Sequence, residues 1–337
     1  MKKFNEIFID KTKYGEKIQT SEYEKQGKHI IVDQGQAEIA GYTNREEGLF
    51  NEVPVIIFGD HTRLIKYIDE PFFLGADGVK VLRSKEKNAN YKYLYYALKS
   101  AKIPNTGYNR HFKWLKDVEI NYPDSVKQEK IVDILDRVSD VIEKRKAELS
   151  YLDTLIKARF VEMFGDPIRN TQNRPTTEFI NVVKMQRGFD LPVQDRQQDG
   201  EIPVYGSNGA LDYHNVAKIH GGVITGRSGT IGKVFYTEGD FWPLNTSLFS
   251  ADTHGNNVIY LGYLLQLFDL TRFVEGTGVP TLNRNMFHNK QIIDVPIDEQ
   301  RQFAAFVNEI DKSKSAVKKA LDETQLLFDS LMQEYFG

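Results

Sequence analysis

The chain has 337 residues, a net charge of −3 and no cysteine. Its length predicts two or three domains, and a hydrophobic fraction of 40% is enough to build buried cores rather than a disordered chain. The absence of cysteine excludes disulfides and thiolate metal sites, as expected of a protein in the reducing cytoplasm. No secretory signal and no apolar run of 18 residues are apparent, so we expect no membrane span.

The charge is spread unevenly along the chain. Residues 1–127 carry an excess of three positive charges, whereas residues 128–166, 167–297 and 298–337 carry net charges of −2, −1 and −3. A purely electrostatic nucleic-acid binder is usually basic. Nucleic-acid binding by this chain would therefore depend on local placement of Arg and Lys, or on a partner that adds positive charge.

The first half of the chain predicts a mixed α/β module of residues 1–127 followed by a long helix over residues 128–165. A short segment, Lys2–Asp10, opens the module, and Val53–Leu82 reads as an apolar strand, a polar loop bounded by glycine and a second strand. Asn90–Ser100 is expected to be a helix. A Thr-Gly loop, "NTGYNRHF", and a strand ending at Pro123 lead into the long helix.

The second half repeats this plan, with a module over residues 166–297 and a long helix over residues 298–337. Thr177–Met185 corresponds to the opening segment, Gly221–Ala251 to the strand–loop–strand unit, and Val258–Leu270 to the helix. The loop "GTGVPTLNRNMF" and a strand ending at Pro296 follow. Gln128–Gly165 aligns with Gln300–Gly337 without a gap, at an offset of 172 residues. Internal repetition of this kind indicates a duplicated architecture.

Both long helices show heptad spacing of apolar residues, which is typical of a coiled coil. The first seam is Ile131, Leu135, Val138, Ile142, Leu149, Leu152, Ile156 and Met163, completed by Arg145 and Arg159. The second is Phe303, Val307, Ile310, Val317, Leu321, Phe328, Leu331 and Tyr335, interrupted by Lys314 and Thr324. A 38-residue helix is about 57 Å long. A single apolar stripe of that length needs a partner, and the other copy is available; two independent helices on separate cores are the alternative.

Two short motifs resemble sites of chemistry. "GRSGTIGKV" has five residues between Gly226 and Gly232 and lacks Ser or Thr after Lys233, so it does not match a phosphate loop, and a tight turn into a strand is expected. "FGDHT" pairs Asp60 with His61 but lacks further metal ligands at suitable spacing, which favours a structural role. No set of residues defines a catalytic site.

Polar residues that suit DNA recognition gather in the predicted loops of both modules. Arg reads guanine, Asn and Gln read adenine, and Ser, Thr and Lys contact phosphates or bases. Ordinary solvated loops remain the alternative for any single residue. The candidates are Gln34, Gln36, His61, Thr62, Arg63, Thr106, Asn109, Arg110 and His111 in the first module, and Ser207, Asn208, Arg227, Ser228, Thr230, Lys233, Thr277, Thr281, Asn283 and Arg284 in the second.

The whole chain resembles the specificity subunit of type I restriction-modification systems. The resemblance rests on "FGDHTR" with "FFLGADGVKVL", on "GRSGTIGKVFY", "YGSNG" and "GTGVPTLN", on the Pro…Gln entry to each long helix and on the twin "FG" endings. It implies an α+β protein in which two pseudo-symmetric target recognition domains are joined by an antiparallel coiled coil. Each domain would read one half of a split sequence in double-stranded DNA.

The resemblance also implies partners that supply the chemistry. Two methyltransferase subunits that use S-adenosylmethionine would dock on the helices, and a restriction motor-nuclease subunit that uses ATP and magnesium would join them. This chain would bind no cofactor and catalyse no reaction. Two other readings stay open: a non-enzymatic scaffold whose globular ends bind proteins, and a nuclease or methyltransferase whose site is assembled from distant residues.

Overall fold

The computed structural model describes residues 1–337 except 76, 198 and 277–279. The chain divides into two compact units, which are described separately below. Unit 1 comprises Met1–Arg145 and Ala320–Gly337, and unit 2 comprises Lys146–Lys319. Each unit therefore contains one of the predicted modules together with part of each long helix.

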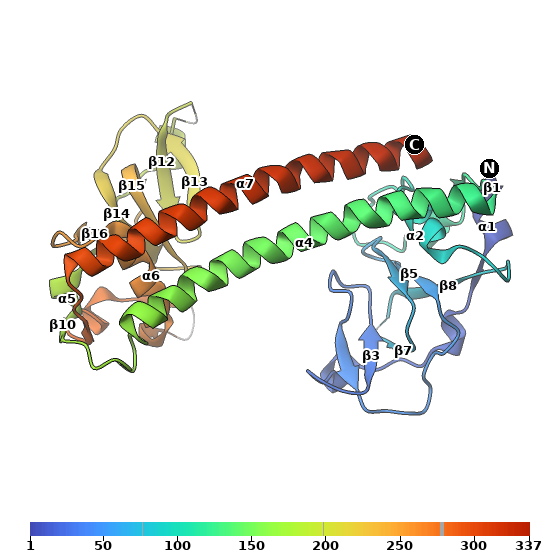
Figure 1. Ribbon diagram of the computed structural model, residues 1–337, viewed down its shortest axis with the longest axis horizontal. Coiled ribbons are helices and arrows are strands. Elements are labelled where there is room, and N and C mark those ends of the chain that lie inside the picture. Colours follow the sequence, from blue (N-terminus) through green and yellow to red (C-terminus); the bar gives the residue numbers. More distant parts are fainter. Residues whose placement is uncertain (76, 198, 277–279) are drawn as a thin grey trace. The chain divides into compact units, whose positions relative to one another are not determined.

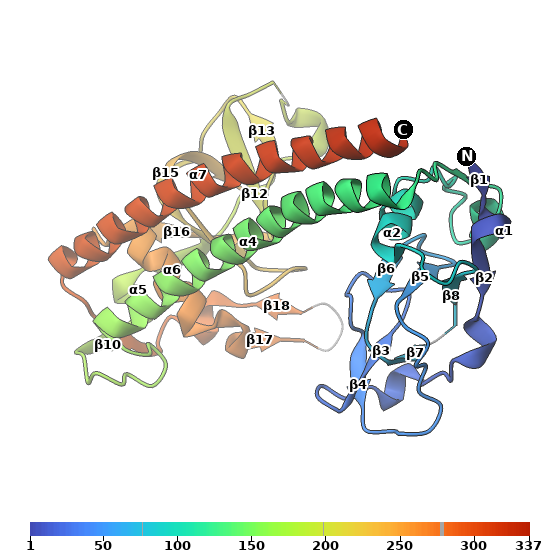
Figure 2. The same ribbon diagram turned by 45° about the vertical axis from the view of Figure 1, so that its right-hand side comes forward.

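Unit 1 is built on a four-stranded antiparallel sheet in the order β2-β8-β5-β6 (Figure 2). These strands are β2 (Phe8–Asp10), β8 (Val79–Ser84), β5 (Val55–Gly59) and β6 (Ile65–Ile68). A second sheet joins β4 (Gly41–Thr43), β3 (His29–Val32) and β7 (Phe72–Leu74), and β1 (Lys2–Lys3) pairs with β9 (Glu119–Ile120). The helices are α1 (Phe4–Ile7), α2 (Tyr91–Lys99), α3 (Phe112–Leu115) and the 3-10 turns η1 (Thr12–Tyr14) and η2 (Thr20–Glu22).

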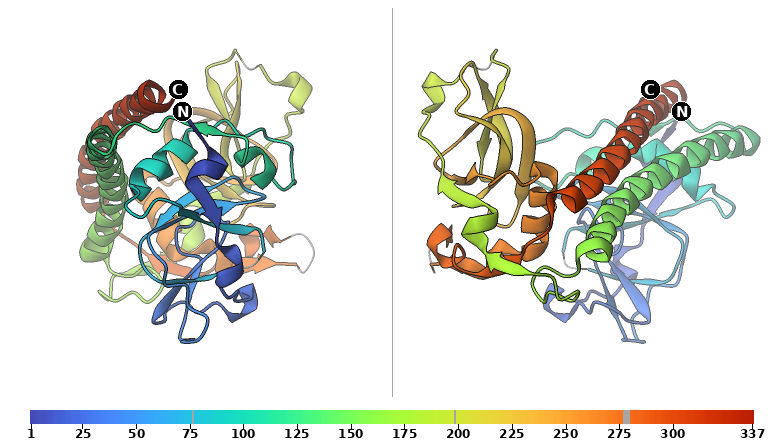
Figure 3. Two further views of the ribbon diagram at one scale, coloured as in Figure 1. Left: turned by 90° about the vertical axis from the view of Figure 1, so that its right-hand side faces the viewer. Right: turned by 60° about the vertical axis from the view of Figure 1, so that its left-hand side comes forward.

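Unit 2 is built on a six-stranded sheet in the order β11-β16-β14-β15-β12-β13, yellow to orange in Figure 3. These strands are β11 (Lys184–Arg187), β16 (Ser247–Asp252), β14 (Ile219–Gly226), β15 (Val234–Pro243), β12 (Ile202–Gly206) and β13 (Gly209–His214). Two further pairs are β10 (Thr176–Glu178) with β19 (Gln291–Ile293), and β17 (Val274–Glu275) with β18 (Thr281–Leu282). The helices are α5 (Phe179–Val182), α6 (Val258–Phe268) and the 3-10 turns η3 (Val193–Asp195), η4 (Leu270–Phe273) and η5 (Arg284–Met286).

The strand order shows that the two modules are copies of one plan. The order β2-β8-β5-β6 in unit 1 corresponds to β11-β16-β14-β15 in unit 2, and the terminal pairs β1-β9 and β10-β19 also correspond. The predicted correspondence of strands and helices and the mixed α/β class are confirmed. The copies differ in their added strands, because β12 and β13 extend the main sheet of unit 2 whereas β3, β4 and β7 form a separate sheet in unit 1.

Equivalent side chains start the corresponding helices of the two modules. The side chain of Asn90 accepts a hydrogen bond from the backbone of Tyr93 at the start of α2, and Asn257 accepts one from Tyr260 at the start of α6. Asparagine is a preferred residue at this position because it satisfies a backbone N–H that has no partner within the helix. The beginning of each helix is thus fixed locally by the sequence.

The long helices are α4 (Ser125–Phe164) and α7 (Ile297–Phe336), each of 40 residues (Figure 1). Helix α4 begins three residues earlier than predicted, because the carboxylate of Asp124 accepts a hydrogen bond from the backbone of Lys127. Every position of the two predicted seams, including the four polar ones, is buried or half-buried. The predicted apolar stripe of each helix is confirmed.

In unit 2, the last turns of α4 pack against the first turns of α7 through aromatic rings. The ring of Phe303 lies 5.4 Å from that of Phe160 and 5.7 Å from that of Phe164. Further along, Lys314 forms an ion pair with Asp153 at 2.7 Å. Because residue numbers rise along one helix as they fall along the other, these two segments run antiparallel.

In unit 1, the last turns of α7 join the core of the first module. Phe328 is buried in one cluster with Ile131, Leu135 and Ile142 of α4. Its ring lies 6.2 Å from Tyr96, whose hydroxyl donates a 2.7 Å hydrogen bond to Asp136 of α4. Segments of both long helices therefore contribute to the core of each unit.

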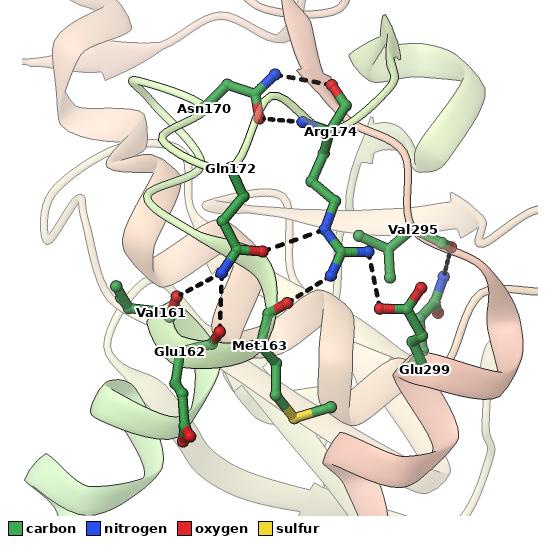
Figure 4. A network of polar contacts seen from close by, with 9 residues as sticks. Val161, Glu162, Met163, Asn170, Gln172, Arg174, Val295 and Glu299 are labelled. Atoms are coloured by element: carbon green, nitrogen blue, oxygen red, sulfur yellow. Dashed lines mark hydrogen bonds and ion pairs between the residues drawn. The ribbon is translucent and has the colours of Figure 1, made fainter.

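The end of α4 is held by a polar network within unit 2 (Figure 4). Gly165, with a φ of 79°, ends the helix as predicted. The side chain of Gln172 donates to the carbonyl of Glu162 (2.8 Å), and the guanidinium of Arg174 donates to the carbonyl of Met163 (2.5 Å). Arg174 also pairs with Glu299 in the first turn of α7 at 2.7 Å. The loop thus ties the end of one long helix to the start of the other.

A buried glutamine marks the entry to each long helix. The side chain of Gln128 donates to the carbonyl of Pro123, and that of Gln300 donates to the carbonyl of Val295, both at 2.8 Å. The two bonds are related by the 172-residue offset of the repeat. Gln300 also accepts from the backbone of Asn257 (2.8 Å) and donates to the side chain of Asn256 (2.7 Å).

Replacing Gln300 with alanine should destabilise unit 2, because several buried polar groups would lose their partners. We expect a loss of roughly 2–4 kcal/mol in the free energy of unfolding, measured by urea denaturation. The control is Gln302→Ala, since Gln302 lies two residues further along α7, is exposed and has no side-chain hydrogen bond in the described structure. Equal losses for the two variants would contradict the role assigned to Gln300.

His288 should make unit 2 sensitive to acid. Its Nε2 accepts a 3.2 Å hydrogen bond from the backbone of Met185, which requires the unprotonated ring. Burial, together with the charges of Arg284 and Lys184, lowers the pKa of His288 below its ordinary value of 6.5. A lowered pKa means that the unfolded chain binds the proton more readily, so this contribution to stability is complete above pH 6.5 and is lost as the pH falls further.

His288→Gln tests this, since glutamine keeps an acceptor but does not titrate. Thermal unfolding measured from pH 8 to pH 5 should show a smaller loss of stability on the acid side in the variant than in the unaltered protein. Superimposable pH profiles for the two proteins would show that His288 does not contribute.

Candidate nucleic-acid interface

Unit 1 brings together loops that lie far apart in the sequence. The backbone carbonyl of Gln34 accepts a hydrogen bond from the hydroxyl of Thr62 (2.8 Å), and its side chain accepts one from the backbone of His61 (3.1 Å). Nδ1 of His61 lies 3.2 Å from the carbonyl of Asn109. The amide of Asn109 in turn donates to the carbonyl of Thr106 at 2.5 Å. Five predicted candidates therefore form one cluster on three loops.

The prediction that His111 contacts DNA is wrong. Its side chain is fully buried, and Nδ1 lies 3.0 Å from the carbonyl of Asp60. The carboxylate of Asp60 accepts a hydrogen bond from the backbone of Phe112 at the start of α3 (2.8 Å). His111 therefore anchors a loop to the core, where no ligand reaches it. Asp60 thus has a structural role in this loop.

Tyr108 belongs to this cluster although the sequence analysis did not select it. Its ring is 87% exposed and stacks on His61 with centroids 4.6 Å apart and planes inclined by 7°. A solvent-exposed tyrosine between polar loop residues was the available signal in "NTGYNRHF". Its flat, exposed face suits contact with a sugar or a base.

The three remaining candidates of unit 1 form no hydrogen bond with the five clustered residues in the described structure. The guanidinium of Arg63 donates to the carbonyl of Ile103 at 3.4 Å. Arg110 lies close enough to Asp77 to contribute to the lowering of its pKa, behind the larger effect of Lys17. Gln36 lines a polar pocket of about 460 Å³ whose other lining residues include Glu38, Leu64, Ile65, Lys66, Tyr67, Asp69, Lys92, Tyr95, Tyr96, Asp136, Ser139 and Asp140. Four carboxylates make that pocket unsuitable for a phosphate.

In unit 2, the loop between β14 and β15 presents four of the ten predicted candidates. A side chain at Gly226 would meet the carbonyl oxygen of Thr230 at 1.8 Å, and Gly229 and Gly232 have φ values of 83° and 95°. The glycines thus build the tight turn that was expected. Arg227, Ser228, Thr230 and Lys233 lie on this turn.

The neighbouring turn between β12 and β13 adds two more candidates. The ammonium group of Lys233 donates a 2.7 Å hydrogen bond to the side chain of Asn208. Ser207 lies beside Gly229, since a side chain at that glycine would come within 3.4 Å of the Ser207 hydroxyl. Two predicted loops are therefore adjacent in the folded unit.

A third segment of unit 2 docks on the same turn. The backbone of Leu282 donates to the carbonyl of Arg227 (2.8 Å), and Ser228 forms a β-bridge with Thr281. Between them lies a pocket of about 280 Å³, whose lining residues are Arg187, Arg227, Leu248, Thr281, Leu282, Asn283, Arg284 and Asn285. Four of these are predicted candidates. Thr277, also predicted, lies outside the described residues.

Arg187, at the end of β11, was missed by the sequence analysis. Only the pairing of β11 with β16, where Arg187 lies opposite Leu248, places it at this pocket. None of the eight lining residues is acidic. Within the described part of the chain, no ion pair or side-chain hydrogen bond involves Arg187, Arg227 or Arg284. The pocket therefore carries uncompensated positive charge.

Among the residues that the structure describes, no group of three His, Asp or Glu side chains is arranged to hold a metal ion. The described helices include none with the length and apolar character needed to cross a bilayer.

Comparisons with known proteins agree with this arrangement of two modules. The family model described as "Type I restriction modification DNA specificity domain" matches residues 1–151 and 170–324. The specificity subunit of the Escherichia coli type I restriction enzyme EcoR124I/EcoR124II is 29% identical over 133 residues, which are 36% of this chain and 33% of that subunit. The sequence match thus spans about a third of that relative's length.

Two solved structures share the fold. The S subunit of a type I restriction-modification system from M. genitalium has a TM-score of 0.64 at 18% identity, over 100% of this chain and 95% of that one. A chain from a structure on complex assembly and conformational transition of the type I R-M system has a TM-score of 0.54 at 13% identity, over 91% of both chains. Together with the family match over both modules, these findings place the chain in the type I restriction-modification DNA specificity family.

Proposed function

We propose that this chain is the DNA-reading subunit of a type I restriction-modification complex and recognises a target in two parts, one with each unit. The observation that carries the proposal is the duplication of one strand plan, in which each copy gathers polar loop residues that suit DNA contact. Equivalent modules suit a ligand that itself offers repeated faces, and a DNA duplex does so at intervals of one helical turn.

The two modules offer different side chains to DNA. Unit 1 presents His61, Tyr108 and Asn109 on clustered loops, whereas unit 2 presents Ser207, Asn208 and Lys233 on two adjacent turns. Hydrogen-bonding groups of different kinds read different base edges. We therefore propose that the two halves of the target differ in sequence.

We propose that α4 and α7 pair as an antiparallel coiled coil along their whole length and so set the gap between the two half-sites. In support, no seam position is exposed, and residues of both helices share a core in each unit. A paired helical rod resists bending, so the separation between the reading modules would be constant.

The long helices also offer surface for partner subunits. Along α4, Val126, Ile134 and Val141 in unit 1 and Tyr151 and Leu155 in unit 2 are exposed apolar residues. Repeated apolar exposure on a helix favours docking of another protein. We propose that two methyltransferase subunits dock here, and that a restriction motor-nuclease joins the complex.

We propose that all catalysis resides in those partners. They would bind S-adenosylmethionine, ATP and magnesium in the cytoplasm, whereas this chain would bind no cofactor. The net charge of −3 supports a division of labour in which the partners supply most sequence-independent contacts to phosphates and this chain discriminates sequence.

Mapping methylated adenines across a host genome tests the proposal. The chain should be expressed with the adjacent methyltransferase gene, with the methyltransferase alone as control. We expect methylation at a two-part motif with a fixed gap only when both are present. If the methylation pattern is the same without this chain, the proposed function is wrong.

Affinity measurements provide a second test. Fluorescence anisotropy with a labelled duplex that contains the mapped motif should show weak binding by this chain alone. Addition of the methyltransferase should give much tighter binding that a duplex of scrambled sequence does not show. Equal affinities with and without the methyltransferase would contradict the proposed sharing of phosphate contacts.

A further inference from the structure

We propose that the pocket of Arg187, Arg227 and Arg284 binds a phosphate of the DNA backbone and does not read a base. The inference rests on the proposed function and assigns one site in unit 2 a specific role in it. In the following, these residues and the space between them are called the arginine pocket.

The charge of the pocket favours an anion. Three arginines line it from three separate elements: the end of β11, the turn after β14 and the start of η5. Like charges repel one another, and no carboxylate lines the pocket to offset them. Burial lowers the pKa of the nearby His288, and the positive charge of Arg284 lowers it further, as expected where positive charge accumulates. A bound anion is the group that would neutralise this arrangement.

The backbones of two of these arginines are held in place by hydrogen bonds. The backbone of Arg227 is held on both sides, because its N–H donates to the carbonyl of Thr246 (2.9 Å) and its carbonyl accepts from Leu282 (2.8 Å). Arg187 is held in the β11–β16 pair. Fixed backbones with unengaged guanidinium groups favour anion binding, since little ordering of the main chain is needed on contact.

The other residues that line the pocket carry no charge. Reading adenine with two hydrogen bonds requires both ends of an asparagine amide. Oδ1 of Asn283 already accepts a 3.1 Å hydrogen bond from the backbone of Asn285. The buried residues Leu248 and Leu282 also line the pocket and are apolar. Asn283 is thus engaged within its own loop, and the three arginines are the charged groups of the pocket, which favours a phosphate over a base edge.

At the corresponding strands, the described residues of unit 1 show a different arrangement. Near the β2–β8 pair, the cation of Lys80 lies 3.8 Å from the carboxylate of Asp10, which also accepts a 2.9 Å hydrogen bond from the backbone of Thr12. The positive charge there already has a negative partner. The arginine pocket is thus a feature of the second module and not a consequence of the shared plan.

The salt dependence of DNA binding tests the assignment. The complex of this chain with its methyltransferase is titrated by fluorescence anisotropy against the mapped duplex and a scrambled duplex, at several salt concentrations. Arg187→Gln and Arg284→Gln should each weaken binding to both duplexes by about tenfold. Each should also reduce the slope of log K against log salt concentration by about 0.9, the value for one lost phosphate contact.

Arg169→Gln is the matched control. Arg169 is an exposed arginine of unit 2 outside the pocket, and its side chain forms no hydrogen bond or ion pair in the described structure. Its replacement should leave affinity and slope unchanged. Thermal unfolding of all variants checks that the fold is retained.

A duplex series with a single uncharged methylphosphonate, moved along the second half-site, locates the contact. At one position, the neutral linkage should weaken binding by the unaltered complex but cause no further loss with Arg284→Gln. Variants that relax the sequence of the second half-site at unchanged salt slope would show base reading and overturn the assignment. Variants that match the Arg169 control would also overturn it. Failure of the proposed function itself would appear differently, as absence of sequence preference in the unaltered complex.

Discussion

Aromatic packing between each module's short helix and the two long helices is the interaction on which this protein depends. In unit 2, Tyr260 of α6 lies 5.2 Å from Phe164 of α4, and Tyr263 lies 5.5 Å from Phe303 of α7. In unit 1, Tyr96 of α2 contacts Phe328 of α7 and donates a hydrogen bond to Asp136 of α4. Large rings bury much apolar area with few rotatable bonds, so they hold the helices in defined positions.

This packing explains why the two copies of the repeat share one scaffold but differ in their loops. Strand order, the asparagine caps and the glutamines at the helix entries recur in both units. The added strands and the loop residues do not. A polar loop contributes little to either core, so its side chains are set by the ligand rather than by the fold. The proposed difference between the two half-sites follows from this separation.

The two reading surfaces also differ in how their polar groups are used. In unit 1, several candidates bind one another, as Gln34 does with Thr62 and His61, and these bonds shape the surface. In unit 2, the guanidinium groups of the arginine pocket have no protein partner in the described structure. A protein whose total charge is negative can thus concentrate positive charge where a phosphate would lie, which is consistent with association that relies on a few well-placed contacts.

The sequence by itself determined the duplication, the two long helices and their apolar stripes, because heptad spacing, glycine stops and asparagine caps act over a few neighbouring residues. It also indicated which loops are polar. Only the tertiary structure decided that His111 is buried, that Asn283 uses its side-chain oxygen locally, and that Arg187 joins Arg227 and Arg284. Burial and pocket membership depend on side chains from strands that are distant in the sequence, and no local pattern encodes which strands become neighbours.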